Sequence, residues 1–146
     1  MEVCRIPMEE LYPILQTQLR RGEAQLPVTG VSMTPTLRGG RDLVRLKRPD
    51  RGAKRGDILL YRRENGQYIL HRVLRSGPTL TCCGDRQTET ESVRPEQVLA
   101  VVTAFCRGGR WHDVDEPLYR LYAALWMLLP LRRCVLFLRQ RMRRSK

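Results

Sequence analysis

The hydrophobic and polar positions near the N-terminus repeat with the period of a helix. In residues 8–21 the acidic residues come first and the basic residues last, an order that suits the helix dipole. The apolar positions on one side are Leu11, Ile14 or Leu15, and Leu19. Because proline is tolerated only in the first helical turn, Pro13 predicts a start close to Glu10, and Gly22 ends the helix.

From residue 26 the pattern changes to short apolar runs separated by glycine and proline, which is typical of β-strands. The predicted strands are 26–31, 42–47, 57–63, 67–75, 79–83, 98–105 and 110–114. Asn65-Gly66, between two of these runs, indicates a hairpin, because both turn residues tolerate positive φ. Several short strands at this spacing predict a compact, mostly β domain.

The C-terminal segment returns to a helical period. Its apolar positions on one face are Leu118, Leu121, Tyr122, Leu125, Leu128 and Leu129. The apolar run 121–131 makes about 16 Å of helix, against a hydrocarbon core of roughly 30 Å, and a longer span would include Arg132 and Arg133. We therefore expect a helix lying in a membrane interface. A helix packed on the core and a true span are the alternatives.

The chain of 146 residues is one domain's worth of sequence. These patterns divide it into an N-terminal helical segment (1–25), a β domain (26–116) and a basic amphipathic C-terminal helix or tail (117–146). The net charge is +12, of which the tail carries +8 because no acidic residue follows Glu116. Its basic residues are Arg120, Arg132, Arg133, Arg139, Arg141, Arg143, Arg144 and Lys146. Since they adjoin Leu, Trp and Phe, they favour an anionic membrane surface over nucleic acid as the partner.

Neither the cysteines nor the N-terminus add a special feature. The chain has five cysteines, an odd number, and two of them are adjacent: Cys4, Cys82, Cys83, Cys106 and Cys134. Because no pair has the spacing of a zinc site, we expect reduced thiols, no metal and no cofactor. The first residues contain no basic region followed by an apolar run, so no signal peptide or N-terminal anchor is expected.

Two segments carry candidate catalytic side chains. In Gly30-Val31-Ser32-Met33-Thr34-Pro35, the serine stands at the end of a predicted strand on a turn, where its hydroxyl can project into a cleft. A serine that only stabilises the turn is the alternative. Strand alternation places His71 on the face of Ile69 and Val73, with Arg72 on the other face. A histidine on an apolar face tends to stay neutral, as a general base must, although it can equally be a core residue.

A third segment, 84–91, follows a predicted strand. It contains Asp85 and Glu91, carboxylates that could orient an imidazole. A solvated acidic loop is the alternative.

In this order, Ser-Met-x-Pro-Thr-Leu from Ser32, Gly56-Asp57, His71-Arg72-Val73 and Gly84-Asp85 resemble the boxes of the S24/S26 peptidase superfamily, over roughly residues 28–105. That superfamily contains the type I signal peptidases and the self-cleaving SOS-type repressors. The resemblance implies the β-fold of signal peptidases and repressor C-terminal domains, with flanking N- and C-terminal helices. It also implies that Ser32 is the nucleophile. Since His71 stands where most bacterial members have lysine, the site is similar to the Ser–His type of the endoplasmic reticulum and archaea.

The chain departs from the family pattern at several positions. Arg86 and Gln87 occupy the two asparagine positions of the Gly-Asp-Asn-Asn box, and Glu91 falls on its later aspartate. Gly30 replaces a serine that supports the oxyanion hole in signal peptidases, and Gly-x-Ser-Met is the repressor spelling. The resemblance then implies that the oxyanion rests on backbone N–H groups of the Gly30–Met33 turn, including that of Ser32.

We therefore expect a serine endopeptidase that cleaves signal or leader peptides, with Ser32 as nucleophile and His71 as general base. Asp85 or Glu91 would fix the imidazole tautomer. The alternative is a non-catalytic peptide-binding or repressor-like regulatory module of the same fold. A peripheral membrane location through the C-terminal helix is expected, or a cytoplasmic one if that helix packs on the core.

Overall fold

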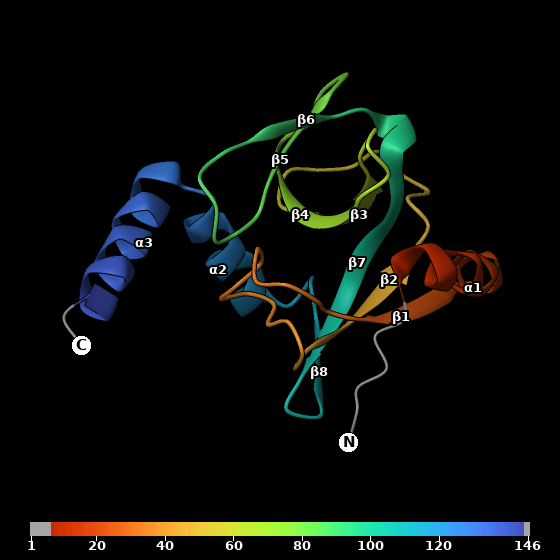
Figure 1. The fold of residues 1–146 in the computed structure, drawn as a ribbon, viewed down its shortest axis with the longest axis horizontal. Helices are drawn as coiled ribbons and strands as arrows, with labels where there is room; N and C mark the ends of the chain where they lie inside the picture. The colour runs from red at the N-terminus through yellow and green to blue at the C-terminus, as the bar shows by residue number, and fades with distance from the viewer. Residues whose placement is uncertain (1–6, 145–146) are drawn as a thin grey trace.

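The computed structural model describes residues 7–144, apart from the side chains of 129–131 and 133. Within these residues eight antiparallel strands form one sheet, with helix α1 (Met8–Arg21) at one end and helices α2 (Pro117–Trp126) and α3 (Leu129–Arg144) at the other (Figure 1). The predicted mostly β architecture with flanking helices is confirmed. Cys4 and Lys146 lie outside the described residues.

The central strand of the sheet is β7. The strands are β1 (Glu23–Pro27), β2 (Leu43–Lys47), β3 (Ile58–Arg62), β4 (Tyr68–Arg75), β5 (Leu80–Cys83), β6 (Glu91–Val93), β7 (Val98–Arg107) and β8 (Arg110–Asp113), with the 3-10 helix η1 (Pro95–Gln97) before β7. Their order is β1-β2-β7-β3-β4-β5-β6, and β8 pairs with the end of β7. β7 pairs with β3 at its start and with β2 over the rest of its length. It thus joins two groups of strands that do not pair with each other.

Two strand predictions differ from the structure. The strand predicted at 26–31 is β1, which begins at Glu23 and ends at Pro27, so the serine-containing segment is a series of turns instead of a strand end. In β1 only Ala24 and Leu26 are buried, and this short alternation directly after Gly22 gave no strong signal. The short strand β6 was not predicted, because its three residues lack an apolar pattern.

Helix α1 begins at Met8, so the predicted start near Glu10 is wrong. Pro13 lies beyond the first turn, where its missing N–H leaves the Glu9 carbonyl without a helical donor. Both residues are exposed, and water can therefore solvate that carbonyl. Of the two predicted alternatives, Leu15 is buried and Ile14 is 54% exposed.

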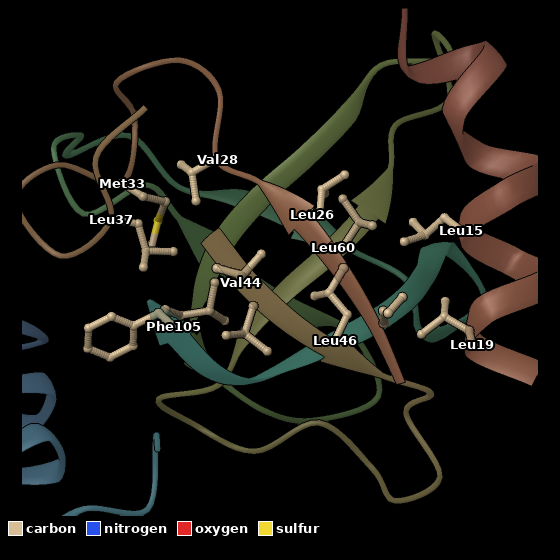
Figure 2. Close-up of a cluster of buried hydrophobic side chains, with 14 residues drawn as sticks. Leu15, Leu19, Leu26, Val28, Met33, Leu37, Val44, Leu46, Leu60 and Phe105 are labelled. Carbon is tan, nitrogen blue, oxygen red and sulfur yellow. The ribbon is translucent and has the colours of Figure 1, made fainter. Parts of the chain in front are cut away.

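Both faces of the sheet are covered by apolar side chains. The first core contains Leu15, Leu19, Leu26, Val44, Leu46, Leu60 and Phe105, among others (Figure 2). The second contains Leu59, Tyr61, Val73, Leu80, Cys82 and Val93. His71 pairs in register with Leu59, while Tyr68 and Leu70 pack against the first core. The predicted alternation along β4 is confirmed.

The C-terminal segment forms two helices instead of the expected single one. α2 packs its aromatic side on the sheet domain, with Ala123 and Trp126 buried. Its leucine side is exposed, and Leu118 is 81% accessible. The predicted packing of this segment on the core is thus seen for the aromatic side of α2, and its membrane association stays a prediction. No helix in the described part of the chain has the length and apolarity to cross a membrane.

The burial difference on α1 gives a matched test of the first core. Leu15→Ala should lower the free energy of unfolding by about 2–5 kcal/mol, because it leaves a cavity under the helix. Ile14→Ala, one position earlier, should cost less than about 1 kcal/mol because that side chain is exposed. Urea denaturation followed by tryptophan fluorescence measures both, and equal losses would contradict this packing.

Candidate active site

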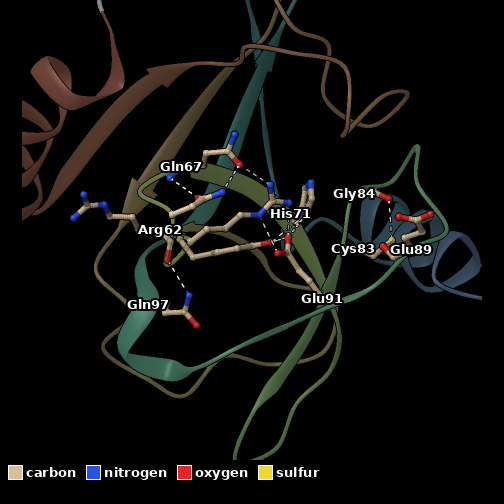
Figure 3. Close-up of polar contacts among 11 residues, drawn as sticks. Arg62, Gln67, His71, Cys83, Gly84, Glu89, Glu91 and Gln97 are labelled. Carbon is tan, nitrogen blue, oxygen red and sulfur yellow. Dashed lines mark hydrogen bonds and ion pairs between the residues drawn. The ribbon is translucent and has the colours of Figure 1, made fainter.

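His71 lies on β4 with only 3% of its surface exposed, and its two ring nitrogens face different surroundings (Figure 3). Nδ1 is 3.2 Å from the Tyr61 hydroxyl and 3.3 Å from Glu91 Oε1. Since the Tyr61 hydroxyl donates its proton to Glu91, the ring proton of neutral His71 is assigned to Nδ1. The lone pair on Nε2 is then available as a base.

Glu91 is fixed from two sides. Arg63 donates from Nε to Oε2 at 3.0 Å and from Nη2 to Oε1 at 2.9 Å, the bidentate geometry of a strong ion pair. Tyr61 donates the remaining hydrogen bond. Burial alone would raise the pKa of Glu91, but the hydrogen bonds from Arg63 and Tyr61 outweigh it and lower the pKa. Glu91 is therefore an anion held beside the imidazole.

The same surroundings keep His71 neutral. Burial lowers the pKa of the imidazole below its ordinary value, and the positive charge of Arg63 lowers it further, while Glu91 opposes both effects. The lowered pKa of His71 agrees with the prediction of a desolvated, neutral histidine. Burial and the neighbouring Glu91 also raise the pKa of Tyr61, which stays protonated and can donate.

Gly84 brings Nε2 of His71 against the Ser32 segment. A Cβ atom at Gly84 would lie 2.6 Å from the Ser32 carbonyl oxygen and 3.1 Å from His71 Nε2, so only glycine fits between them. The Arg86 N–H donates to the same carbonyl at 2.9 Å and fixes the segment there. Ser32 is partly exposed, and its hydroxyl makes no hydrogen bond to another described residue. The hydroxyl can therefore rotate towards a base or a substrate.

Side-chain hydrogen bonds to Thr36 and Pro35 hold the turn that carries Ser32. Thr36 donates to Asp85 and shares a 2.7 Å hydrogen bond with the Tyr122 hydroxyl of α2. Arg107, at the end of β7, donates to the Pro35 carbonyl at 3.1 Å and to Asp42 at 3.2 Å. The Thr34–Pro35 peptide bond within the turn is cis.

Asp85 forms a fully buried ion pair with Arg72, on the face of β4 opposite His71. Two hydrogen bonds of 2.8 Å join them, and Arg72 also donates to the Gly56 carbonyl at 3.0 Å. Burial alone would lower the pKa of Arg72, yet Asp85 raises it. Of the two predicted carboxylates, Glu91 thus lies beside the imidazole of His71, and Asp85 pairs with Arg72 on the opposite face of β4.

The remaining predicted residues belong to the serine turn. Gly30 has φ of 73°, a left-handed conformation. Its carbonyl lies so close to Gly39 that a side chain at position 39 would collide with this carbonyl. The side chain of Met33 is buried in the first core, so only its backbone can take part in binding. The sequence analysis did not identify Tyr61 of β3 or Arg63, which directly follows β3, although their alternate positions in the predicted strand 57–63 could have placed them beside His71.

A hollow of about 600 Å³ opens beside His71 and Glu91 and is bounded on its far side by Leu136 and Phe137 of α3. Cys82, Cys83, Cys106 and Cys134 are free thiols. Within residues 7–144, no group of three or more His, Cys, Asp or Glu side chains could hold a metal ion. The hollow therefore offers an imidazole and a carboxylate held by Arg63, while the Ser32 backbone lies on the other side of Gly84 from His71 Nε2.

No protein-family model and no curated protein matches this chain.

Two substitutions should move the pKa of His71 in opposite directions. Arg63→Gln removes a nearby cation and releases Glu91, so the pKa should rise. Glu91→Gln removes the anion, so the pKa should fall. An NMR titration of the imidazole Cε1–H measures both, with Arg62→Gln, the exposed neighbour on β3, as control. Shifts of the same sign would contradict the arrangement.

Proposed function

We propose that this protein is a serine endopeptidase of the signal peptidase type, in the S24/S26 superfamily, with Ser32 as nucleophile and His71 as general base. The observation that carries the proposal is the close approach at Gly84. It sets the basic nitrogen of a buried, neutral histidine beside the backbone of a partly exposed serine. The order of the motifs and the antiparallel sheet with flanking helices support the same assignment.

In this reaction His71 Nε2 takes the proton of the Ser32 hydroxyl as Oγ attacks a peptide carbonyl. The imidazolium then protonates the leaving amine, and an acyl-enzyme remains. Water, deprotonated by the same nitrogen, hydrolyses the ester and regenerates Ser32. The Ser32 N–H donates no backbone hydrogen bond to another described residue, and it is therefore the N–H group we assign to the oxyanion.

Glu91 and Asp85 have different roles in the proposed mechanism. The Tyr61 hydroxyl, which donates to Glu91, accepts from Nδ1 of His71 and fixes its tautomer, and the Glu91 carboxylate 3.3 Å from Nδ1 stabilises the imidazolium as it forms. Arg63 and Tyr61 position Glu91. Asp85 acts at a distance, because it holds Arg72 and Thr36 and so keeps the serine turn in place.

The substrate class, a signal or leader peptide, follows from the resemblance. The exposed apolar residues of the C-terminal helices support a location at a membrane, where such substrates are found. They are Leu118, Leu121, Leu125 and Leu128 around α2, and Leu138 on α3. Because Arg120 and Arg141 are close to them in sequence, we propose peripheral association with an anionic lipid surface.

Substitution of Ser32 or His71 should reduce peptide cleavage, whereas substitution of another serine or histidine should not. Purified protein with a signal- and leader-peptide library, analysed by mass spectrometry, should give cleavage that Ser32→Ala abolishes. His71→Ala should reduce it by about 10²–10⁴-fold. The controls Ser92→Ala and His112→Ala should retain it, since neither side chain lines the hollow beside His71. Cleavage should persist below pH 6.5 and fall only as His71 becomes protonated, because its pKa is lowered.

Full activity of His71→Ala would contradict the mechanism. If the peptides bind but none is cleaved, and a fluorophosphonate probe does not label Ser32, the chain is a peptide-binding or regulatory module without catalysis.

Membrane association should depend on the leucine side of α2. The intact protein should sediment with vesicles containing anionic lipid, and less with purely zwitterionic ones. The double variant Leu121→Ser with Leu125→Ser should bind more weakly, because both side chains are about half exposed or more. Ile14→Ser, an equally exposed residue on α1 at the opposite end of the molecule (Figure 1), is the control. Equal binding to both vesicle types would contradict the role of the arginines.

A further inference from the structure

Helix α3 forms one wall of a groove made of two adjoining hollows, which reaches from His71 to Thr34. The hollow beside His71 adjoins a second hollow of about 520 Å³, which reaches Thr34, two residues after Ser32. Both are lined by Arg86 of the loop after β5 and by Leu136 and Gln140 of α3. An extended peptide in this groove would run from His71 in one hollow to Thr34 of the serine turn in the other.

The two hollows differ in charge. The second is lined by three arginines, Arg86, Arg139 and Arg143, and by no carboxylate. None of the three forms an ion pair with another described residue. The first hollow instead contains Glu89 and Glu91 together with Arg63 and Arg86, so its formal charges cancel. The groove is thus positive at its Thr34 end and has no net formal charge at its other end.

The arrangement of α3 accounts for this asymmetry. Leu136, Arg139, Gln140 and Arg143 are spaced by three or four residues, so they share one helix face. Arg141 lies off that face and lines neither hollow. The apolar Leu136 and Met142 in the second hollow can contact the methylene groups of a substrate, while the guanidinium groups pair with its charges.

We propose that the second hollow binds carboxylate side chains of the peptide substrate, so that the enzyme selects peptides with acidic residues on one side of the scissile bond. The inference rests on the proposed peptidase function and adds the specificity of its site. A peptide is favoured over a nucleic acid because the hollow continues directly into the groove at His71. Acidic residues on the other side of the bond would meet equal numbers of arginines and carboxylates in the first hollow, and they would therefore gain little.

The preference can be measured on the whole chain without lipid. Fluorescence anisotropy with the Ser32→Ala protein compares a peptide carrying Asp and Glu with the same peptide carrying Asn and Gln. Two exposed charge pairs should make the acidic peptide bind about tenfold tighter at moderate salt, and the difference should shrink at high salt. The double variant Arg139→Glu with Arg143→Glu should lose the preference. Arg141→Glu, with the same charge change per site on the same helix, should keep it.

Cleavage by the unmodified protein supplies the second measurement. Rates over a library in which acidic residues move along the peptide should rise on one side of the scissile bond only. Ser32-dependent cleavage without such a side preference overturns the inference and leaves the proposed function intact. Acidic peptides that bind through Arg139 and Arg143 but are never cleaved leave the inference intact and contradict the proposed function. A single-stranded oligonucleotide that binds these arginines more tightly than the acidic peptide also overturns it.

Discussion

The buried ion pair between Arg72 and Asp85 is the interaction on which the rest of the site depends. It connects β4 to the loop after β5, and through Thr36 it reaches the turn that carries Ser32. Trp126 of α2 donates to the backbone carbonyl of Asp85 at 3.0 Å, so the C-terminal helices are attached to the same point. Removal of one partner from such a pair leaves an unpaired buried charge, which typically costs about 3–5 kcal/mol.

Adjacent residues of β4 divide the work between the two faces of the strand. Arg72 faces the scaffold, and His71 faces the hollow with Glu91 and Tyr61. Successive side chains of a strand point to opposite faces. Because the ion pair of Arg72 fixes the backbone of β4, it also fixes the position of the neighbouring His71 side chain on the opposite face. In the mechanism we propose, a base held on such a strand would need little reorganisation.

Local patterns predicted the position of His71 but not its partners. Alternation and the Asn-Gly turn act within a few residues, so they were enough to place this side chain on an apolar face. The choice between Asp85 and Glu91 depends on how the loop after β5 folds back onto β3 and β4, which no local pattern encodes. Tyr61 was within reach of sequence reasoning, because Leu59, two residues before it, pairs with His71. The buried ion pair between Arg72 and Asp85 could not be predicted from the sequence, since the two residues are thirteen positions apart and meet on the side of β4 away from the hollow.

The central place of β7 has a consequence for biosynthesis. As the chain leaves the ribosome, β1 and β2 emerge first, followed by β3 to β6, and neither group can complete the sheet without the strand at 98–107. Until then β2 and β3 each have an unpaired edge, the kind of surface on which chains aggregate. Pairings between segments so far apart in sequence also form slowly. The nascent chain therefore passes through a stage in which β2 and β3 each lack one of their two neighbouring strands, and a chaperone that shields strand edges would act at this stage.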